Sequence, residues 1–336
     1  MKYNNRFYLF PLLCLFLVLT ACEHDTDQFD GPGLVDRFGE FQLLEGLTIS
    51  RATVDFSAGE TVIFGARFNK RLNFTLRITG MESGSVKTIQ GFDNELNANN
   101  AVWSGGTTML PLFKREMCQV ELIIPDENNL TLTGMVEIVG TKSYEGSLFT
   151  DFETPLGANL FTGNFEFELT NRTGRQNDMP AAQGDWYFLF EGTDNVVPNF
   201  FVGLADISAR VTGETYIPFP TTVPEDLYFN AFIYADGGPH GIAVIQFVYD
   251  LNNTGLFEDG QDQTFQLAGD YPLDFTGWRQ ISHPMSDLGI TQAQLSKMVG
   301  IRLLLISNMN SQPSPPLKVD YGIDFITFTA GGPLEL

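Results

Sequence analysis

Short runs of β-forming residues, separated by Gly, Asn and Asp, fill almost the whole chain beyond residue 37. Runs of this length with polar turn residues between them predict strands joined by short connections. Only residues 286–298 (SDLGITQAQLSKM) have the pattern of a helix, with Ser286 as its expected N-cap. The chain is therefore expected to be all-β.

The runs form two blocks, which predict two domains. Residues 37–145 contain TVIFGARF, LNFTLRITG, SVKTIQGF, CQVELIIPD and LTLTGMVEIVG, a spacing typical of an immunoglobulin-like β-sandwich. Residues 146–336 contain about ten runs, from SLFTDFE to VDYGIDFITFT, which is too many for a seven-stranded sandwich. This second block is expected to be a β-jelly roll.

The first 21 residues have the layout of a signal peptide. Lys2 and Arg6 precede an apolar run that ends at Leu19 and is shorter than the roughly 20 residues a membrane-spanning helix needs. Residues 22–36 (CEHDTDQFDGPGLVD) are acidic and interrupted by Gly and Pro, which predicts a flexible tether in front of the first domain.

Leu19-Thr20-Ala21-Cys22 resembles the lipobox of bacterial lipoproteins. The resemblance implies that the chain is cut before Cys22 and that the Cys22 thiol carries the lipid. The protein would then touch the membrane through its lipid anchor only. An ordinary signal peptide followed by a chance cysteine is the alternative.

The net charge narrows the classes of ligand. The chain has 41 acidic and 19 basic residues, and removing the signal peptide takes away two of the basic ones. Such a field excludes nucleic acid as a partner and disfavours polyanions, unless a local basic patch overrides it. Neutral glycans and calcium remain compatible. Cys118 would be the only unmodified thiol of the mature chain, so no intramolecular disulfide is expected.

Three stretches of the second block, SLFTDFE, WRQISHPMSDLG and VDYGIDFITF, resemble a carbohydrate-binding jelly roll of the galactose-binding-like kind. With the lipobox and the tether, the whole chain is similar to the surface glycan-binding lipoproteins of starch-utilisation-type systems. This resemblance implies an outer-membrane protein facing the cell exterior, which captures a polysaccharide or oligosaccharide beside an importer complex. The tether resembles an export signal whose acids are Glu23, Asp25, Asp27 and Asp30.

One face of the run LYFNAFIYAD is the first candidate for ligand binding. Because successive strand residues point to opposite sides, Phe229, Ala231, Ile233 and Ala235 form an apolar face. Tyr228, Asn230, Phe232 and Tyr234 lie on the other. Aromatic rings offer flat surfaces to sugar C–H groups, and an amide pairs with hydroxyls. A strand that is covered on both faces is the alternative.

Other runs add candidates by the same alternation. If GIAVIQFVYD pairs with LYFNAFIYAD as a hairpin, Gln246 joins Asn230 on the polar face. Tyr187 and Arg302 also point away from apolar neighbours, although a surface salt bridge is an alternative use of the arginine. Tyr216 and Phe219 lie in a Pro-containing loop and are candidate exposed rings.

The tryptophans are assigned separately. Trp186 and Trp278 are expected to pack in the core, because their partners in the alternation are largely apolar. Trp103 is either a core residue or a second sugar platform.

A structural calcium ion is possible, and no other cofactor is required. The resemblance to jelly rolls places it where the first and last strands meet, with Glu153 and Asp324 as ligands. The loop DLNNTGLFEDGQD offers Asp250 and Asn252 at the alternate positions of a calcium loop. Its twelfth position is Gln261, which supplies no bidentate carboxylate, so a plain hairpin turn is the favoured interpretation.

The chain is not expected to be an enzyme. It has no HExxH or G-x-S-x-G motif, and only Glu166 and Glu168 of NFEFELT offer a pair of carboxylates on one strand face. Three hypotheses remain: a surface lipoprotein that binds a neutral glycan, which leads; a jelly-roll glycoside hydrolase or lyase; and a non-glycan adhesin or assembly subunit.

Overall fold

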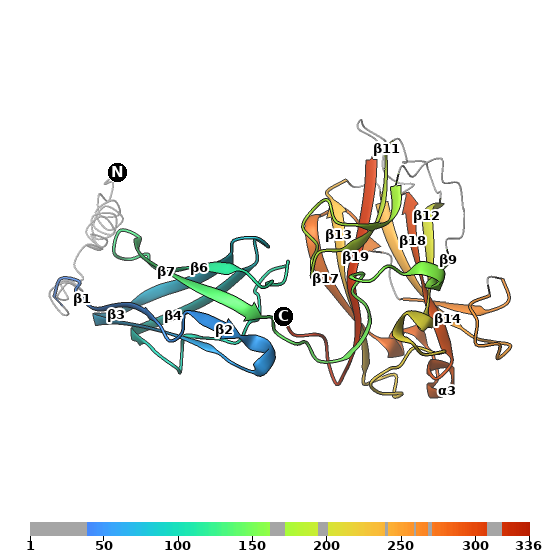
Figure 1. Ribbon diagram of the computed structural model, residues 1–336, viewed down its shortest axis with the longest axis horizontal. Coiled ribbons are helices and arrows are strands. Elements are labelled where there is room, and N and C mark those ends of the chain that lie inside the picture. The colour runs from blue at the N-terminus through green and yellow to red at the C-terminus, as the bar shows by residue number, and fades with distance from the viewer. Residues whose placement is uncertain are drawn as a thin grey trace, which may run out of the picture.

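The computed structural model describes residues 39–161, 172–193, 201–238, 241–258, 260–267, 271–307 and 318–336. The signal peptide, Cys22 and the acidic tether lie outside these ranges, so they stay predictions. Strands dominate the described residues and the described helices span three or four residues each, which confirms the all-β prediction. Two domains lie along the long axis of the molecule, and each strand pairs only within its own domain (Figure 1).

The N-terminal domain is built around one long strand. β3 pairs with β1, β4, β5 and β6, and so connects the seven strands of this domain into one sheet. An immunoglobulin sandwich has two separate sheets, so this pairing does not confirm the immunoglobulin-like prediction. The elements are β1 (Leu43–Ile49), β2 (Thr53–Asp55), η1 (Phe56–Ala58), β3 (Val62–Gly80), β4 (Val86–Leu96), β5 (Val102–Trp103), β6 (Met117–Ile124) and β7 (Leu130–Gly140).

Trp103 lies in the core of the N-terminal domain. Its side chain is fully buried between Phe56 and Phe113, with ring centroids 4.7 and 4.9 Å away. The indole N–H donates to the Gly106 carbonyl oxygen at 2.8 Å. Of the two interpretations of Trp103, the core one is confirmed.

In its described residues, the C-terminal domain consists of two six-stranded sheets packed face to face, which confirms the predicted jelly roll. We call them the β13 sheet (β10-β11-β19-β13-β17, with β8 on β19) and the β14 sheet (β15-β14-β18-β12-β9, with β16 on β14). The elements are β8 (Ser147–Thr150), η2 (Gly157–Asn159), β9 (Leu160–Phe161), β10 (Arg172–Gln176), β11 (Tyr187–Thr193), β12 (Phe201–Ser208), η4 (Ala209–Thr212), β13 (Leu227–Asp236), β14 (Gly241–Tyr249), β15 (Gln263–Gln266), β16 (Tyr271–Pro272), β17 (Thr276–Pro284), η5 (Met285–Leu288), α3 (Gln292–Leu295), β18 (Met298–Ser307) and β19 (Lys318–Ala330).

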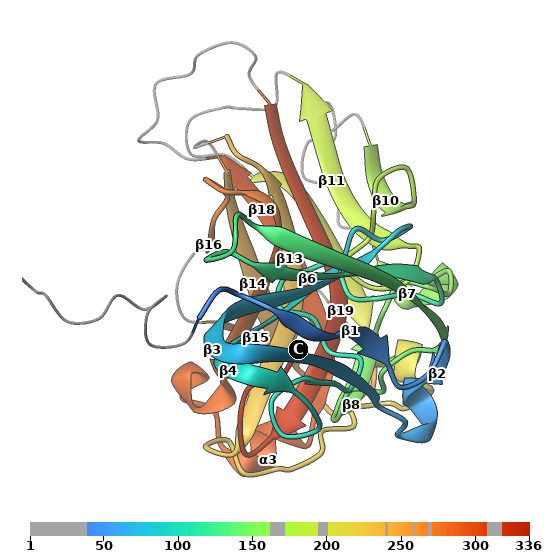
Figure 2. The same cartoon turned by 90° about the vertical axis from the view of Figure 1, so that its left-hand side faces the viewer.

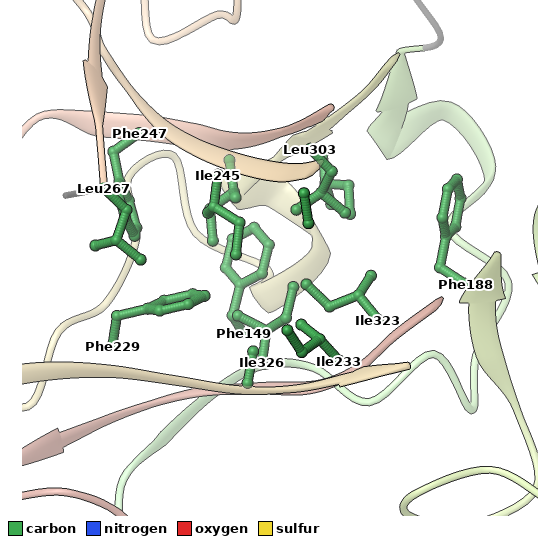
Figure 3. Close-up of a cluster of buried hydrophobic side chains, with 14 of the residues drawn as sticks. Phe149, Phe188, Phe229, Ile233, Ile245, Phe247, Leu267, Leu303, Ile323 and Ile326 are labelled. Atoms are coloured by element: carbon green, nitrogen blue, oxygen red, sulfur yellow. The ribbon is translucent and has the colours of Figure 1, made fainter. Parts of the chain in front are cut away.

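The main core lies between these two sheets (Figure 3). Phe229 and Ile233 of β13 meet Ile245 and Phe247 of β14, and all four are at most 2% exposed. Leu303 of β18 joins them. The alternation read from the sequence therefore assigned the inward faces of these strands correctly.

The predicted helix over 286–298 is wrong in its extent and in its cap. Gly289, at φ 64°, ends the 3-10 turn η5 in the left-handed conformation that glycine adopts most easily. A separate turn of helix, α3, then starts after Thr291, whose side chain forms a capping box with Gln294. Within the described ranges, no helix has the length and the apolar character needed to cross a bilayer.

The two domains meet at a small apolar junction. Leu112 of the first domain and Ala182 of the second cluster with Phe232 and Leu334, and the Leu112 N–H donates to the Ala182 carbonyl at 2.7 Å. Lys114 and Asp185 form an ion pair across the junction at 2.6 Å. The C-terminal end of the chain lies between the domains, as the two perpendicular views show (Figures 1 and 2).

We predict that Phe229→Ala lowers the free energy of unfolding by about 3–5 kcal/mol, because it opens a cavity among the rings of Phe247 and Phe328. Urea unfolding measures the loss. Phe92→Ala is the matched control, since Phe92 is 56% exposed and the same substitution there should cost far less. Equal losses in the two variants would contradict this account of the core.

Candidate functional site

The strands β13 and β14 lie in opposite sheets, so the hairpin considered from the sequence does not form. β13 pairs with β17 and β19, whereas β14 pairs with β15, β16 and β18. The chain crosses from one sheet to the other after Asp236. Asn230 and Gln246 consequently lie on opposite outer faces of the sandwich, and the predicted ligand residues divide into two groups.

Asn230, on the outer face of the β13 sheet, is fully buried and holds the C-terminal segment 331–336 in place. Its Oδ1 accepts from the Leu334 N–H at 2.9 Å and from Ser282 Oγ at 2.6 Å. Its Nδ2 donates to Thr329 Oγ1 at 2.9 Å and to the Tyr228 carbonyl at 3.3 Å. These four bonds use the full capacity of an amide, so the expected sugar contact is corrected to a structural one.

Other predicted residues of this outer face are also covered. Tyr187 is fully buried, and its hydroxyl donates to Asp178 at 2.6 Å. Phe232 is stacked on Phe325, with centroids 5.4 Å apart. Tyr228 is half-buried where β13 begins. Most of this face is therefore an internal packing surface, which agrees with the alternative of a strand covered on both sides.

Tyr234, one of the predicted ligand-binding rings, lies near the surface next to a second aromatic ring. It is half-buried beside Trp278, its cross-strand neighbour, with centroids 5.5 Å apart. Gly322 lies against both rings. A Cβ at this position would come within 2.9 Å of Tyr234 and 3.3 Å of Trp278, so a larger residue would displace them. Trp278 packs against two small buried clusters on this outer face, and not in the core between the two sheets where the alternation placed it.

The loop residues Tyr216 and Phe219 serve packing. The Tyr216 hydroxyl donates to Asp250 at 3.0 Å, and this bond to a carboxylate raises the pKa of Tyr216. The Phe219 ring meets Phe328 edge to face at 4.7 Å. Neither ring is the exposed platform that the loop composition predicted.

A row of polar side chains crosses the outer face of the β14 sheet, and we call it the polar row. The register places Gln266 of β15 opposite Gln246 of β14, Gln246 opposite Arg302 of β18, and Arg302 opposite Asp206 of β12. Gln246 Nε2 donates to Gln266 Oε1 at 3.3 Å. Arg302 donates from Nε and Nη2 to the two Asp206 oxygens at 2.7 and 2.9 Å. Two predicted ligand residues, Gln246 and Arg302, are thus neighbours.

Exposure falls along the polar row. Gln266 is exposed and Gln246 is half-buried, whereas the side chains of Arg302 and Asp206 are 13% and 4% exposed. The arginine is therefore in a largely buried, bidentate ion pair and not in the surface salt bridge considered from sequence. Removing either partner would leave an uncompensated charge, so the two glutamines are the members of the row that a ligand can engage at least structural cost.

Apolar groups flank the polar row on both sides. The Phe257 ring lies 5.8 Å from the Arg302 guanidinium carbon and against Gly300, where a Cβ would come within 2.6 Å of the ring. On the other side, Leu204, Val244 and Leu304 form a small buried cluster. The face thus combines planar polar groups with an aromatic ring.

The proposed calcium ligands Glu153 and Asp324 both fix the loop that contains Gln183 and Asp185. Glu153 Oε1 accepts from the Asp185 and Trp186 N–H groups at 2.7 and 2.9 Å, and Asp324 Oδ2 accepts from the Gln183 N–H at 2.7 Å. Burial raises the pKa of Asp324 well above its ordinary value, against the effect of its backbone hydrogen bonds. A calcium ion between the two carboxylates stays a prediction.

The loop after β14 uses its oxygens internally. Asp250 is fully buried and accepts from the Thr254 and Gly255 N–H groups at 3.1 and 2.8 Å, and Asn252 donates to Glu258 at 2.9 Å. In the part of the chain that the structure describes, no group of three or more His, Cys, Asp or Glu side chains is arranged to hold a metal ion. The candidate carboxylates Glu166 and Glu168 lie outside the described residues.

Sequence reasoning missed Gln266, Asp206 and Phe257 as neighbours of Gln246 and Arg302. Each lies on a different strand or loop, and only the strand order brings them together. The alternation in FFVGLADIS places Asp206 on the outward side of its strand, and this was the one indication in the sequence. It predicts the face on which the residue lies but not its partner.

No family model matches the chain, and no curated protein does. Among solved structures, carbohydrate-binding modules of the β-sandwich superfamily described as promiscuous share 12% identity over 86% of this chain and 97% of theirs, at a TM-score of 0.37. A xylan-binding domain from Paenibacillus barcinonensis shares 11% identity over 56% of this chain and 97% of its own, with a TM-score of 0.32. A family 30 carbohydrate-binding module of a Clostridium thermocellum cellulosomal cellulase shares 14% identity over 55% of this chain and 98% of its own, with a TM-score of 0.36. These values are too low to transfer a ligand to this chain.

We predict that Asp324→Asn gains stability relative to the wild type as the pH rises from 4 to 8. A carboxyl whose pKa is raised in the folded state stabilises the fold fully only below its unfolded pKa, near 3.8, and this contribution is lost as the pH rises through the folded value. The asparagine does not ionise. Thermal unfolding of both proteins across this pH range measures the difference, and a difference that does not change with pH would contradict the burial argument.

The same pair of proteins tests the calcium prediction. If Glu153 and Asp324 hold a calcium ion, adding calcium at pH 8 raises the unfolding temperature of the wild type and a chelator lowers it, because a ligand of the folded state stabilises by mass action. Asp324→Asn should respond to neither.

Proposed function

We propose that the protein binds a neutral polysaccharide or oligosaccharide on the outer face of the β14 sheet. The observation that carries this proposal is the polar row, in which Gln266, Gln246 and Arg302 stand side by side across three neighbouring strands. The two planar amides present several hydrogen-bonding groups to a chain of hydroxyls, whereas the Arg302 guanidinium beside them is largely engaged by Asp206. Phe257 adds an aromatic surface next to the row.

The electrostatics of the polar row favour a neutral ligand. Asp206 compensates the only formal positive charge of the row through the bidentate pair with Arg302. The chain as a whole carries a formal net charge of −22, which repels polyanions from such a face. Hydroxyl groups need no charge, and the long 3.3 Å bond between the two glutamines is one that a hydroxyl can replace.

The cellular setting of the proposal comes from the N-terminal sequence. A lipid on Cys22 would anchor the chain to the outer membrane, and the acidic residues 23–36 would direct it to the exterior and space it from the surface. There it would hold glycan for an outer-membrane importer complex. The role is one of capture, and it assigns no catalytic step to the chain.

We predict that Gln246→Ala weakens binding of a neutral polysaccharide by about 2- to 10-fold, and that Gln246→Ala with Gln266→Ala weakens it further. Each lost hydrogen bond is worth about 0.5–1.5 kcal/mol, and 1.4 kcal/mol is tenfold in Kd. Affinity electrophoresis against a panel of polysaccharides, followed by calorimetry on the polymer that retards the protein, measures the effect. The glutamines are chosen over Arg302 because its loss would leave Asp206 unpaired and disturb the fold.

Two further variants make the result specific. Gln119→Ala is the matched control, since Gln119 is an exposed glutamine on β6 of the other domain and should leave binding unchanged. Tyr234→Ala tests the opposite face of the jelly roll. Loss of binding in Tyr234→Ala together with normal binding in the glutamine variants would move the site to the β13 sheet, and no retardation by any polysaccharide would contradict glycan binding itself.

We also predict that Cys22→Ser prevents lipidation and releases the protein from the membrane fraction, because it removes the thiol that the lipid would modify. Metabolic labelling with palmitate and cell fractionation measure both effects. Protease treatment of intact cells then tests the outward orientation of the wild type. A protected wild-type protein would contradict a position on the cell surface.

A further inference from the structure

A cavity of about 520 Å³ lies at the junction of the two domains. Its lining comes from the loop before β6 (Lys114 and Arg115), from the linker (Lys142 and Tyr144), and from Gln183, Asp185 and Phe325 of the jelly roll. Pockets that bind small molecules typically measure about 300–1,000 Å³ and often lie between domains. The polar row lies on the outer face of the β14 sheet, so this cavity is a separate place.

The cavity is rich in positive charge for so acidic a chain. Lys114, Arg115 and Lys142 line it together with two acids, Glu82 and Asp185, whereas the whole chain has 19 basic against 41 acidic residues. Asp185 is already paired with Lys114 at 2.6 Å. Burial and the neighbouring Lys87 lower the pKa of Lys142, although Glu335 and Glu145 near it act in the opposite direction. An anionic group in the cavity would relieve the unfavourable burial of this lysine.

Two aromatic rings form a fixed wall of the cavity. Tyr144 and Phe325 meet edge to face with centroids 5.9 Å apart, and Lys142 Nζ lies 4.8 Å from the centre of the Tyr144 ring. The back of Phe325 is stacked on Phe232. Phe325 also has φ 46°, a conformation that is uncommon for a residue other than glycine and that is typical of functional sites. The wall is thus held in position before any ligand arrives.

Gln183 contributes an acceptor that has no donor. Its backbone N–H is fixed by Asp324 at 2.7 Å, but its side-chain Oε1 is buried and accepts no hydrogen bond within the described part of the chain. The large majority of buried side-chain polar atoms have a hydrogen-bond partner, so an exception in a cavity wall points to a missing donor. A hydroxyl group is such a donor.

We propose that this cavity is a second ligand site and that it takes a sugar carrying a carboxylate. Lys142 and Arg115 would hold the carboxylate, and the wall of Tyr144 and Phe325 would face the apolar side of the ring. The half-buried Gln183 side chain would turn its covered Oε1 into the cavity and accept a hydroxyl proton. The three basic side chains of the lining exceed its two acidic ones by one charge, which locally offsets the overall negative field. This site goes beyond the neutral-glycan function proposed above and does not depend on it.

Calorimetry on the full chain tests the proposal with three probes. Trigalacturonate presents a carboxylate sugar as part of an oligosaccharide, and galacturonate presents the same sugar as a free monosaccharide. Maltotriose is the neutral comparison. We expect at least one acidic probe to bind, with an affinity that falls as salt rises. Maltotriose should not bind in the cavity.

Two variants assign this binding to the cavity. Gln183→Leu should weaken the acidic probe about fivefold or more while the unfolding temperature stays the same or rises, because the atom removed had no partner. Lys142→Met should weaken it by a similar factor and reduce the salt dependence. Lys297→Met is the control for the change in net charge, since Lys297 contacts Asn253 far along the chain from the cavity lining.

The outcomes are distinguishable from those for the polar row. The Gln246→Ala, Gln266→Ala protein should bind the acidic probe like the wild type. Binding that neither Gln183→Leu nor Lys142→Met weakens, or no binding of either acidic probe, would overturn the site. Equal binding of maltotriose that the same two variants abolish would overturn the proposed ligand class.

Discussion

Most of the β13 sheet is buried on both of its faces, and this double burial limits the surface that the sheet has left for a ligand. One face packs against the β14 sheet through residues such as Phe229 and Ile233. The other is covered by the loop of Ala182 and by the C-terminal segment, which Asn230 holds through the Leu334 N–H, while its three other hydrogen bonds go to the strands of the sheet. A buried amide is stable only when its bonds are satisfied, so the same residue that looks suited to a sugar is committed to the fold.

This commitment explains where sequence reasoning succeeded and where it failed. The alternation of residues along β13, β14 and β18 gave the inward faces correctly, because a strand in a sandwich core needs one continuous apolar side. It could not tell that the second face of β13 is also covered. The covering segment 331–336 is about a hundred residues away in sequence, and an amide facing a distant segment has the same local pattern as an amide facing water.

The order of the strands in the two sheets also could not be predicted from the sequence. β13 and β14 are adjacent in the chain and separated by few residues, which favours a hairpin, yet they lie in opposite sheets. The polar row exists because β18, which comes late in the sequence, inserts between β12 and β14. Gln246 and Arg302 were both recognised as outward-facing residues. Their meeting depends on a long-range pairing that no local pattern encodes, and the same holds for Gln266 and Asp206.

At the junction between the domains, the covered outer face of the β13 sheet also contacts the first domain. Phe232 and Phe325 extend the outer face of the β13 sheet into the contact with Leu112, and Phe325 at the same time forms the wall of the cavity. The other contacts across the junction include one backbone hydrogen bond and the ion pair of Lys114 with Asp185, whose aspartate side chain is 72% exposed. Exposed pairs contribute little, and small interfaces between domains leave relative motion as the default. A ligand seated between the domains would contact both, and it would favour the arrangement described here over any other by the difference between its affinities for the two. Occupation of the cavity would in this way also fix the direction of the jelly roll relative to the first domain.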